Sequence, residues 1–126
     1  MTSPFTCGLD AVLQVMGGKW KSLIVYHLSR GTLRYGTLRR AIGKVSDKVL
    51  AQQLKELIAD GVVLRHDYGE VPLKVEYSLT PFGISFATAL VQLCEWGAQH
   101  SSDLAAIVAR RPASNNGDPH AIDVSR

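Results

Sequence analysis

The spacing of apolar residues changes at Gly61, and this change allows only a few folds. On the N-terminal side of Gly61, apolar residues recur every three or four positions, as they do along one face of an α-helix. Beyond it the period falls to about two residues, which predicts β-strands over residues 62–68 and 75–79. A short loop, residues 69–72, lies between them. The chain is therefore expected to form a β-hairpin directly after a helix.

Four helices are expected before this hairpin. Each has an apolar stripe on one side and ends near a glycine, which readily adopts the conformation that terminates a helix. The fourth is the best defined, because Ser46 can cap its first turn, Asp47 suits the positive end of its dipole and Gly61 ends it. The helices are predicted over residues 9–16, 20–28, 35–42 and 46–60.

The longest predicted helix spans residues 81–100 and carries two apolar stripes. One stripe is expected to cover the core, with Phe82, Phe86, Ala89, Leu90, Leu93 and Trp96. A domain of this size covers only one face of such a helix, and an apolar face left in water marks an interface. The second stripe is therefore expected to form a homodimer, together with Leu9 of the first helix. Its residues are Ile84, Ala87, Val91, Cys94 and Ala98.

Together these elements predict a mainly α fold with a small β-hairpin, an α+β arrangement known as a winged helix-turn-helix. The 126 residues are enough for one domain with a core but not for two. We place the winged helix-turn-helix domain at residues 1–100, including a dimerisation helix at 81–100. Residues 101–126 are expected to extend the last helix and to end in a disordered C-terminal tail.

Charge is divided unevenly along the chain, although the net charge is only +3. Residues 19–55 contain nine basic residues and one acid, whereas residues 56–100 contain two basic residues and six acids. A surface with one strongly positive region is typical of proteins that bind the phosphate backbone of nucleic acids. Charge alone would equally suit membrane lipids or an acidic protein, so the DNA interpretation depends on the helix-turn-helix pattern.

The polar face of the fourth helix is expected to enter the major groove of double-stranded DNA. On this face, lysine can bind phosphate or guanine, glutamine can pair with adenine, and a small apolar side chain can contact a thymine methyl group. Basic residues on the third helix and the turn would hold the backbone, and two more flank the wing. The predicted DNA contacts are Arg39, Arg40, Lys44, Ser46, Lys48, Val49, Gln52, Lys55, Arg65 and Lys74.

Several other classes of protein are disfavoured by what the sequence does not contain. No phosphate-binding glycine loop, carboxylate pair or Ser/His/Asp set suggests an enzyme, and no cofactor is expected. The two cysteines and four histidines show no metal-ligand spacing. No apolar run is long enough to span a membrane and the first residues do not resemble a signal peptide, so a cytoplasmic protein is expected.

Six short segments occur in an order that resembles the HxlR family of winged-helix regulators, which are MarR-like. They are Cys-Gly-Leu at 7–9, Gly-Lys-Trp-Lys at 18–21, Leu-Arg-Tyr-Gly-Thr-Leu at 33–38, Ile-Gly-Lys-Val-Ser at 42–46, Val-Glu-Tyr-Ser-Leu-Thr at 75–80 and Cys-Glu-Trp-Gly at 94–97. The resemblance covers about residues 7–100 and implies a dimeric bacterial or archaeal repressor or activator. The operator of a dimer is expected to be a pseudo-palindrome.

The same resemblance draws attention to Cys7. Some similar regulators sense quinones, aldehydes or oxidants through a cysteine just before the first helix, where Cys7 stands. The positive end of a helix dipole also favours the thiolate, which makes Cys7 a candidate redox or electrophile sensor. Two alternatives stay open: a regulator that responds to a ligand without a thiol switch, and a winged helix that contacts only proteins.

Overall fold

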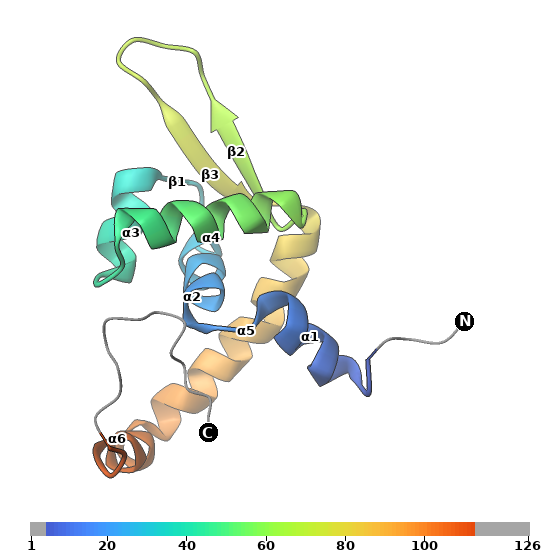
Figure 1. Cartoon of the computed structure of the whole chain (residues 1–126), viewed down its shortest axis with the longest axis vertical. Helices are drawn as coiled ribbons and strands as arrows, with labels where there is room; N and C mark the ends of the chain where they lie inside the picture. The colour runs from blue at the N-terminus through green and yellow to red at the C-terminus, as the bar shows by residue number, and fades with distance from the viewer. Residues whose placement is uncertain (1–4, 113–126) are drawn as a thin grey trace.

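The computed structural model describes residues 5–112, which form six helices and a three-stranded sheet. Figure 1 shows a compact group of helices from which a β-hairpin projects at one end and a long helix leads away at the other. The elements are α1 (Gly8–Met16), α2 (Lys19–Leu28), β1 (Leu33–Arg34), α3 (Tyr35–Ile42), α4 (Asp47–Ala59), β2 (Val63–Asp67), β3 (Val75–Leu79), α5 (Pro81–Gln99) and α6 (Ser101–Ala109). The predicted winged helix-turn-helix is therefore confirmed.

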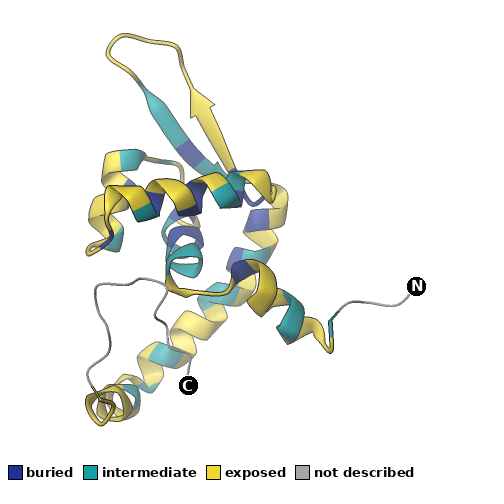
Figure 2. Cartoon of the chain, viewed as in Figure 1, coloured by how far each residue is buried: buried dark blue, intermediate teal, exposed yellow. Residues whose placement is uncertain are grey.

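The core lies where α2, α3, α4 and the base of the hairpin meet (Figure 2). Ile24 of α2, Leu38 of α3 and Leu50 and Leu57 of α4 are fully buried there. Burial of a side chain of this size stabilises the fold by about 1.5–3 kcal/mol. The same packing fixes α4 with its polar side outward, as the alternation of apolar and polar residues predicts.

The hairpin belongs to an antiparallel sheet with the strand order β1-β3-β2. Tyr77 at the centre of β3 pairs with Leu33 on one side and Arg65 on the other. The sequence predicts β2 and β3 but not β1, because a strand of two residues has no periodicity to recognise. This third strand joins the base of the wing to the start of α3.

Specific local contacts set the ends of α4 and α5. The hydroxyl of Ser46 accepts a hydrogen bond from the Val49 amide at 3.1 Å, so the predicted cap of α4 is confirmed. Thr80 caps α5 and also donates its hydroxyl to the Gly61 carbonyl at 2.7 Å. A Cβ atom at Gly83 would collide with the Val62 carbonyl oxygen, so the glycine lets α5 pack closely against the chain that leaves α4.

The predictions for α5 and for the residues after it need correction. Ala87, predicted to contact a second chain, is 4% exposed and packs in the core of the protomer. Of the predicted core stripe, Phe86 and Leu90 do pack against the core, whereas Phe82, Leu93 and Trp96 are 61%, 63% and 52% exposed. The side of α5 that faces the core therefore differs from the predicted stripe, and only the first half of α5 packs against the core.

The chain beyond α5 does not simply extend that helix. His100 has φ −114° and ψ 24°, which ends α5, and α6 begins at Ser101 as a separate helix. The tail predicted to be disordered lies almost entirely in residues 113–126, outside the described part of the chain. Among the described helices, none is long and apolar enough to cross a membrane.

Candidate DNA-binding surface and thiol site

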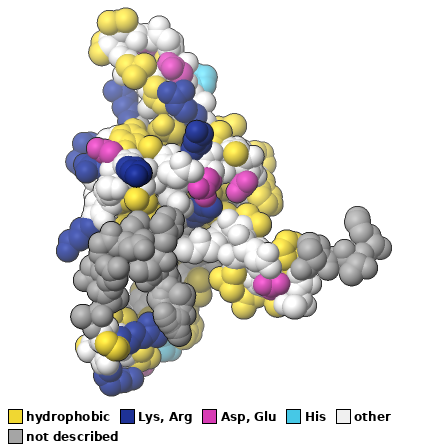
Figure 3. All heavy atoms as spheres, in the orientation of Figure 1, with side chains coloured by type: hydrophobic (Ala, Val, Ile, Leu, Met, Phe, Trp, Pro, Cys, Tyr) yellow, Lys and Arg dark blue, Asp and Glu magenta, His cyan; other side chains and the backbone are white. Residues whose placement is uncertain are grey.

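One face of α4 presents polar side chains to solvent. Lys48, Gln52 and Lys55 are exposed and are spaced three or four residues apart, which places them on the same side of the helix. Ala51 is exposed beside them, whereas Val49 is half-buried against the core. Figure 3 shows Lys and Arg side chains gathered over α3, α4 and the base of the wing, with acidic side chains among them.

The predicted DNA contacts differ in whether they already have a partner. Among residues 5–112, no ion pair involves Lys44, Lys48 or Lys55. Arg40 donates a long hydrogen bond, 3.3 Å, to the hydroxyl of Thr37. Within the described part of the chain, none of these four cations would lose an ion pair on binding a phosphate.

Arg39, by contrast, is paired with Asp47 at the start of α4. The Arg39 Nε lies 2.9 Å from the Asp47 Oδ1, and the Tyr35 hydroxyl donates to the same oxygen at 2.8 Å. Burial, together with this hydrogen bond, raises the pKa of Tyr35 to about 12. The tyrosine therefore stays protonated at neutral pH and joins α3 to the N-terminus of α4.

Gln52 has a partner on its own helix, and that partner is held from α2. The Gln52 Nε2 donates to the Glu56 Oε2 at 2.9 Å. The other carboxylate oxygen of Glu56 lies 2.7 Å from the Lys21 Nζ, and the Lys21 side chain is only 13% exposed. Glu56 thus connects Lys21 of α2 to Gln52, which is predicted to contact a base.

Two predicted DNA contacts lie in the wing: Arg65 on β2, and Lys74 directly before β3. Arg65 on β2 forms a long ion pair, 3.9 Å, with Asp67. The Lys74 Nζ lies 4.3 Å from the centre of the Tyr68 ring, a cation–π contact. The Tyr68 hydroxyl donates to Glu76 at 2.7 Å, which fixes the ring beneath the lysine.

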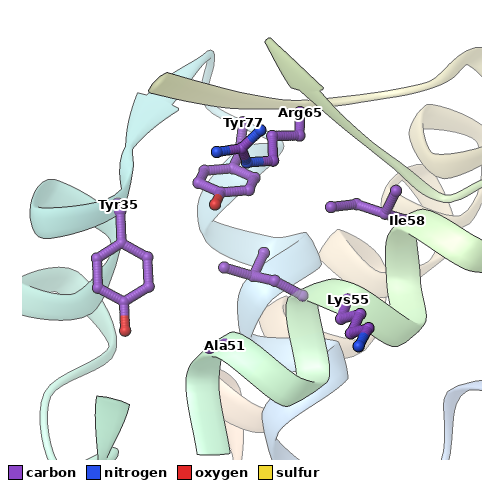
Figure 4. A pocket seen from close by; sticks show the side chains of 7 residues that line it. Tyr35, Ala51, Lys55, Ile58, Arg65 and Tyr77 are labelled. Atoms are coloured by element: carbon purple, nitrogen blue, oxygen red, sulfur yellow. The ribbon is translucent and has the colours of Figure 1, made fainter. Parts of the chain in front are cut away.

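A hollow of about 260 Å³ lies between α4 and the sheet (Figure 4). It brings together two cations that the sequence places on separate elements, Lys55 of α4 and Arg65 of the wing. Ala51, Leu54 and Ile58 form its α4 wall. Tyr35 and Tyr77 contribute the aromatic part of its lining.

Cys7 occupies the cap position of α1. Its Sγ accepts the Asp10 amide at 3.4 Å, and the thiol is exposed. Hydrogen bonds from the backbone of Asp10 and Leu9 lower the pKa of the Cys7 thiol below its ordinary value. Asp10 in turn accepts the Thr6 amide at 3.0 Å, which holds the residue before Cys7 against the helix. Cys7 is therefore both accessible and more easily ionised than an ordinary cysteine.

The predicted dimer contacts, apart from Ala87 and Val91, are exposed in the protomer. Leu9 is 66% and Ile84 55% exposed, and Cys94 and Ala98 are also exposed, whereas Val91 is half-buried. Further large apolar side chains are exposed on α1, α5 and α6. They are Val12, Leu13, Val15, Phe82, Leu93, Trp96, Ile107 and Val108.

Sequence reasoning missed the partners of the predicted contacts. It treats Asp47 only as a residue suited to the helix dipole, and it assigns no role to Lys21 or Glu56. Their contacts with Arg39 and Gln52 depend on how α2, α3 and α4 cross, which no local pattern specifies. Among the described residues, no group of three or more His, Cys, Asp or Glu side chains is placed to hold a metal ion.

The family match and the known relatives of this chain agree on a helix-turn-helix regulator. Residues 15–104 match the HxlR-like helix-turn-helix family. The HTH-type transcriptional regulator YtcD of Bacillus subtilis (strain 168) is 46% identical over 96 residues, which is 76% of each chain.

The solved structures that resemble this chain include those of a redox regulator and of a protein treated with diamide, which oxidises thiols. The redox regulator HypR in its reduced form has a TM-score of 0.73 and 40% identity, over 79% of this chain and 99% of that one. Diamide-treated YodB of B. subtilis has a TM-score of 0.61 and 30% identity, over 75% and 94%. The chain therefore belongs to the HxlR-like helix-turn-helix family and is a transcriptional regulator of the HxlR and MarR type.

Proposed function

We propose that this regulator is a repressor that binds a pseudo-palindromic operator as a homodimer and responds to oxidants or electrophiles through Cys7. The observation that carries the DNA-binding part is the exposed polar face of α4, which presents Lys48, Gln52 and Lys55 to solvent. A helix with its apolar side buried and this face in solvent matches the geometry of a recognition helix.

In the proposed complex, α4 enters the major groove and the surrounding cations bind the backbone. Gln52 contacts an adenine, Lys48 contacts phosphate or guanine, and Val49 or the more exposed Ala51 contacts a thymine methyl group. Lys55 and Arg65 both line the hollow between α4 and the wing, and each would bind backbone phosphate at this part of the surface. The remaining contacts proposed are Arg39, Arg40, Lys44, Ser46 and Lys74.

The uncovered apolar surface of α1, α5 and α6 supports a homodimer. Leu93 is 63% exposed on this surface, so Leu93→Glu should convert the dimer to a monomer in analytical ultracentrifugation. Leu64→Glu is a matched control, because Leu64 is similarly exposed but lies on β2 in the wing. A Leu93→Glu protein that remains dimeric would show that the interface lies elsewhere.

Cys7 is suited to sensing because its thiol is exposed and its pKa is lowered by the backbone at the start of α1. An oxidant that takes two electrons and two protons from the Cys7 thiols of two protomers would leave one S–S bond between them. An electrophile would instead form a bond to the thiolate sulfur. Since α1 contributes apolar surface to the proposed dimer, either change would alter the spacing of the two α4 helices.

Repression is the simplest output of this architecture. Within residues 5–112, every element belongs either to the winged helix or to the helices that carry the apolar surface. Such a protein can block a promoter by occupying it. A reporter gene placed behind an operator that overlaps the promoter should therefore be less active when the protein is present, and more active after treatment with diamide.

The decisive experiment is a gel-shift titration with DNA from upstream of the protein's own gene. Reduced protein should bind specifically, and diamide should weaken binding by the Cys94→Ser variant but not by Cys7→Ser. Binding that is indifferent to diamide would leave the regulator intact and remove the thiol switch. Continued failure to find a specific fragment across genomic DNA would favour a winged helix that contacts only proteins.

A further inference from the structure

The amide of Gln52 is oriented in the free protein by a contact chain that begins on another helix. Its Nε2 donates one hydrogen bond, at 2.9 Å, to Glu56. Glu56 is itself held by Lys21 of α2, at 2.7 Å. Because the Lys21 side chain is mostly buried, its ammonium group has little freedom to move away. This arrangement gives the carboxylate of Glu56 a fixed position beside the DNA-facing side of α4.

The contact with Glu56 leaves Gln52 equipped to contact one base. A glutamine amide has two N–H donors and one carbonyl acceptor. Glu56 takes one donor, so one N–H and the Oε1 remain. Recognition of adenine uses these two groups, because the amide donates to N7 and accepts from the N6 amino group. The carboxylate also prevents the amide from turning over, since a reversed amide would place its Oε1 against a negative charge.

We propose that Lys21 and Glu56 are positioning residues for sequence recognition: they fix the polarity of the Gln52 amide and so determine its preference for one base. This inference rests on the proposed DNA-binding function and extends it to two residues outside the recognition surface. A glutamine on an exposed helix face otherwise samples several rotamers, which would weaken its preference. The pair therefore contributes to specificity without itself contacting DNA.

An electrostatic role for the pair predicts a different result from a positioning role. Loss of the Glu56 carboxylate removes a negative charge near DNA and should strengthen non-specific binding. Loss of the Lys21 ammonium removes a positive charge and should weaken it. If the pair positions Gln52, however, both losses reduce base preference at the same position, with the larger effect from Glu56 because it contacts the amide directly.

The test is selection from a randomised duplex library, followed by competition binding with the selected operator and its single-base variants. The proteins are wild type, Gln52→Ala, Glu56→Ala, Lys21→Met and Lys21→Arg. The position contacted by Gln52 is the one at which Gln52→Ala loses its preference, normally roughly 5- to 160-fold for a bidentate contact. We expect Glu56→Ala to lower that preference at least about threefold and Lys21→Arg, which keeps the ion pair, to retain it.

Base preference is a ratio of two affinities measured on one protein preparation, so partial unfolding of a variant does not change it. Asp60→Ala is the matched charge control, because Asp60 is an exposed acid at the end of α4. In a Gln52→Ala background, the substitution Glu56→Ala should have no further effect on preference at this position.

The outcomes separate this inference from the proposed function. If wild type selects a sequence but Glu56→Ala keeps its preferences, the positioning role is wrong and the regulator stands. If Gln52→Ala changes no preference, Gln52 does not contact a base and the inference also fails. If wild type selects no sequence at all, the proposed function fails first.

Discussion

Replacement of Lys48 and Lys55 by alanine should weaken DNA binding in a way that depends strongly on salt. Both side chains are exposed on α4, and neither takes part in an ion pair within residues 5–112. Within residues 5–112, no carboxylate lies within ion-pair distance of either ammonium group. Alanine keeps the helix propensity of these positions, so the substitution removes charge while the fold is preserved.

The size of the effect follows from counterion release. A lysine that binds a phosphate of B-DNA releases about 0.9 condensed counterion, and a dimer presents each lysine twice. Loss of both lysines should lower the slope of log affinity against log salt by up to about 3.6. Between about 50 and 200 mM salt, that difference changes the ratio of wild-type to variant affinity by roughly 150-fold.

Fluorescence anisotropy with a labelled operator measures these slopes directly. The matched control is the double variant Arg110→Ala, Arg111→Ala, which removes the same number of charges at the end of α6, far from α4 and the wing (Figure 1). The control slope should equal that of wild type. An unchanged slope in the Lys48→Ala, Lys55→Ala variant would refute the assignment of α4 to the DNA, and equal losses in the two double variants would show a non-specific charge effect.

Three further predictions concern the thiol and the stability of the fold. In a Cys94→Ser background, the pH midpoint for alkylation of Cys7 by iodoacetamide should lie below that of the urea-unfolded chain, because the backbone at the start of α1 favours the thiolate only in the folded state. The lowered pKa of Cys7 also stabilises the fold at pH values above the ordinary thiol pKa, and this stabilisation is lost as the pH falls through the lower pKa of the folded state. Identical alkylation midpoints for the folded and the unfolded chain would contradict both expectations. Leu54→Ala should lower the free energy of unfolding by about 2–5 kcal/mol in urea titrations, since Leu54 is buried. Ser46→Ala should lower it by about 0.5–2 kcal/mol, whereas Ser46→Asp, which can still cap α4, should cost less.

The sequence predicts the helices and the hairpin well because local rules define them. Tyr35–Ile42 is predicted with its observed bounds, and Ser46 caps α4 as expected. Both outcomes depend on residues within a few positions of one another. The two-residue strand β1 depends instead on Tyr77, more than forty residues away, so no local pattern reveals it.

The assignment of the α5 stripes shows the limit of periodicity. Two apolar stripes compete for the core, and residue size favours the one with Phe82 and Trp96. The structure selects the line through Gly83 and Ala87 because small residues allow α5 to lie close to the sheet and to α2. Close approach between elements depends on the shape of both partners, which a helical wheel does not contain.

The candidate site likewise has a part that the sequence predicts and a part that it does not. The cations on α4 are visible in the sequence because their spacing and charge are local, and the structure exposes them as expected. The sequence also counts Arg39 among the cations, but the structure pairs it with Asp47 at 2.9 Å. The carboxylate offsets part of the Arg39 charge, so we expect a phosphate contact to gain less at Arg39 than at Lys48, which has no ion pair among the described residues. Asp47 also holds Tyr35, so release of Arg39 leaves the carboxylate with a partner and keeps α3 joined to α4. We therefore expect that Arg39 can turn toward a backbone phosphate without loosening the helix-turn-helix.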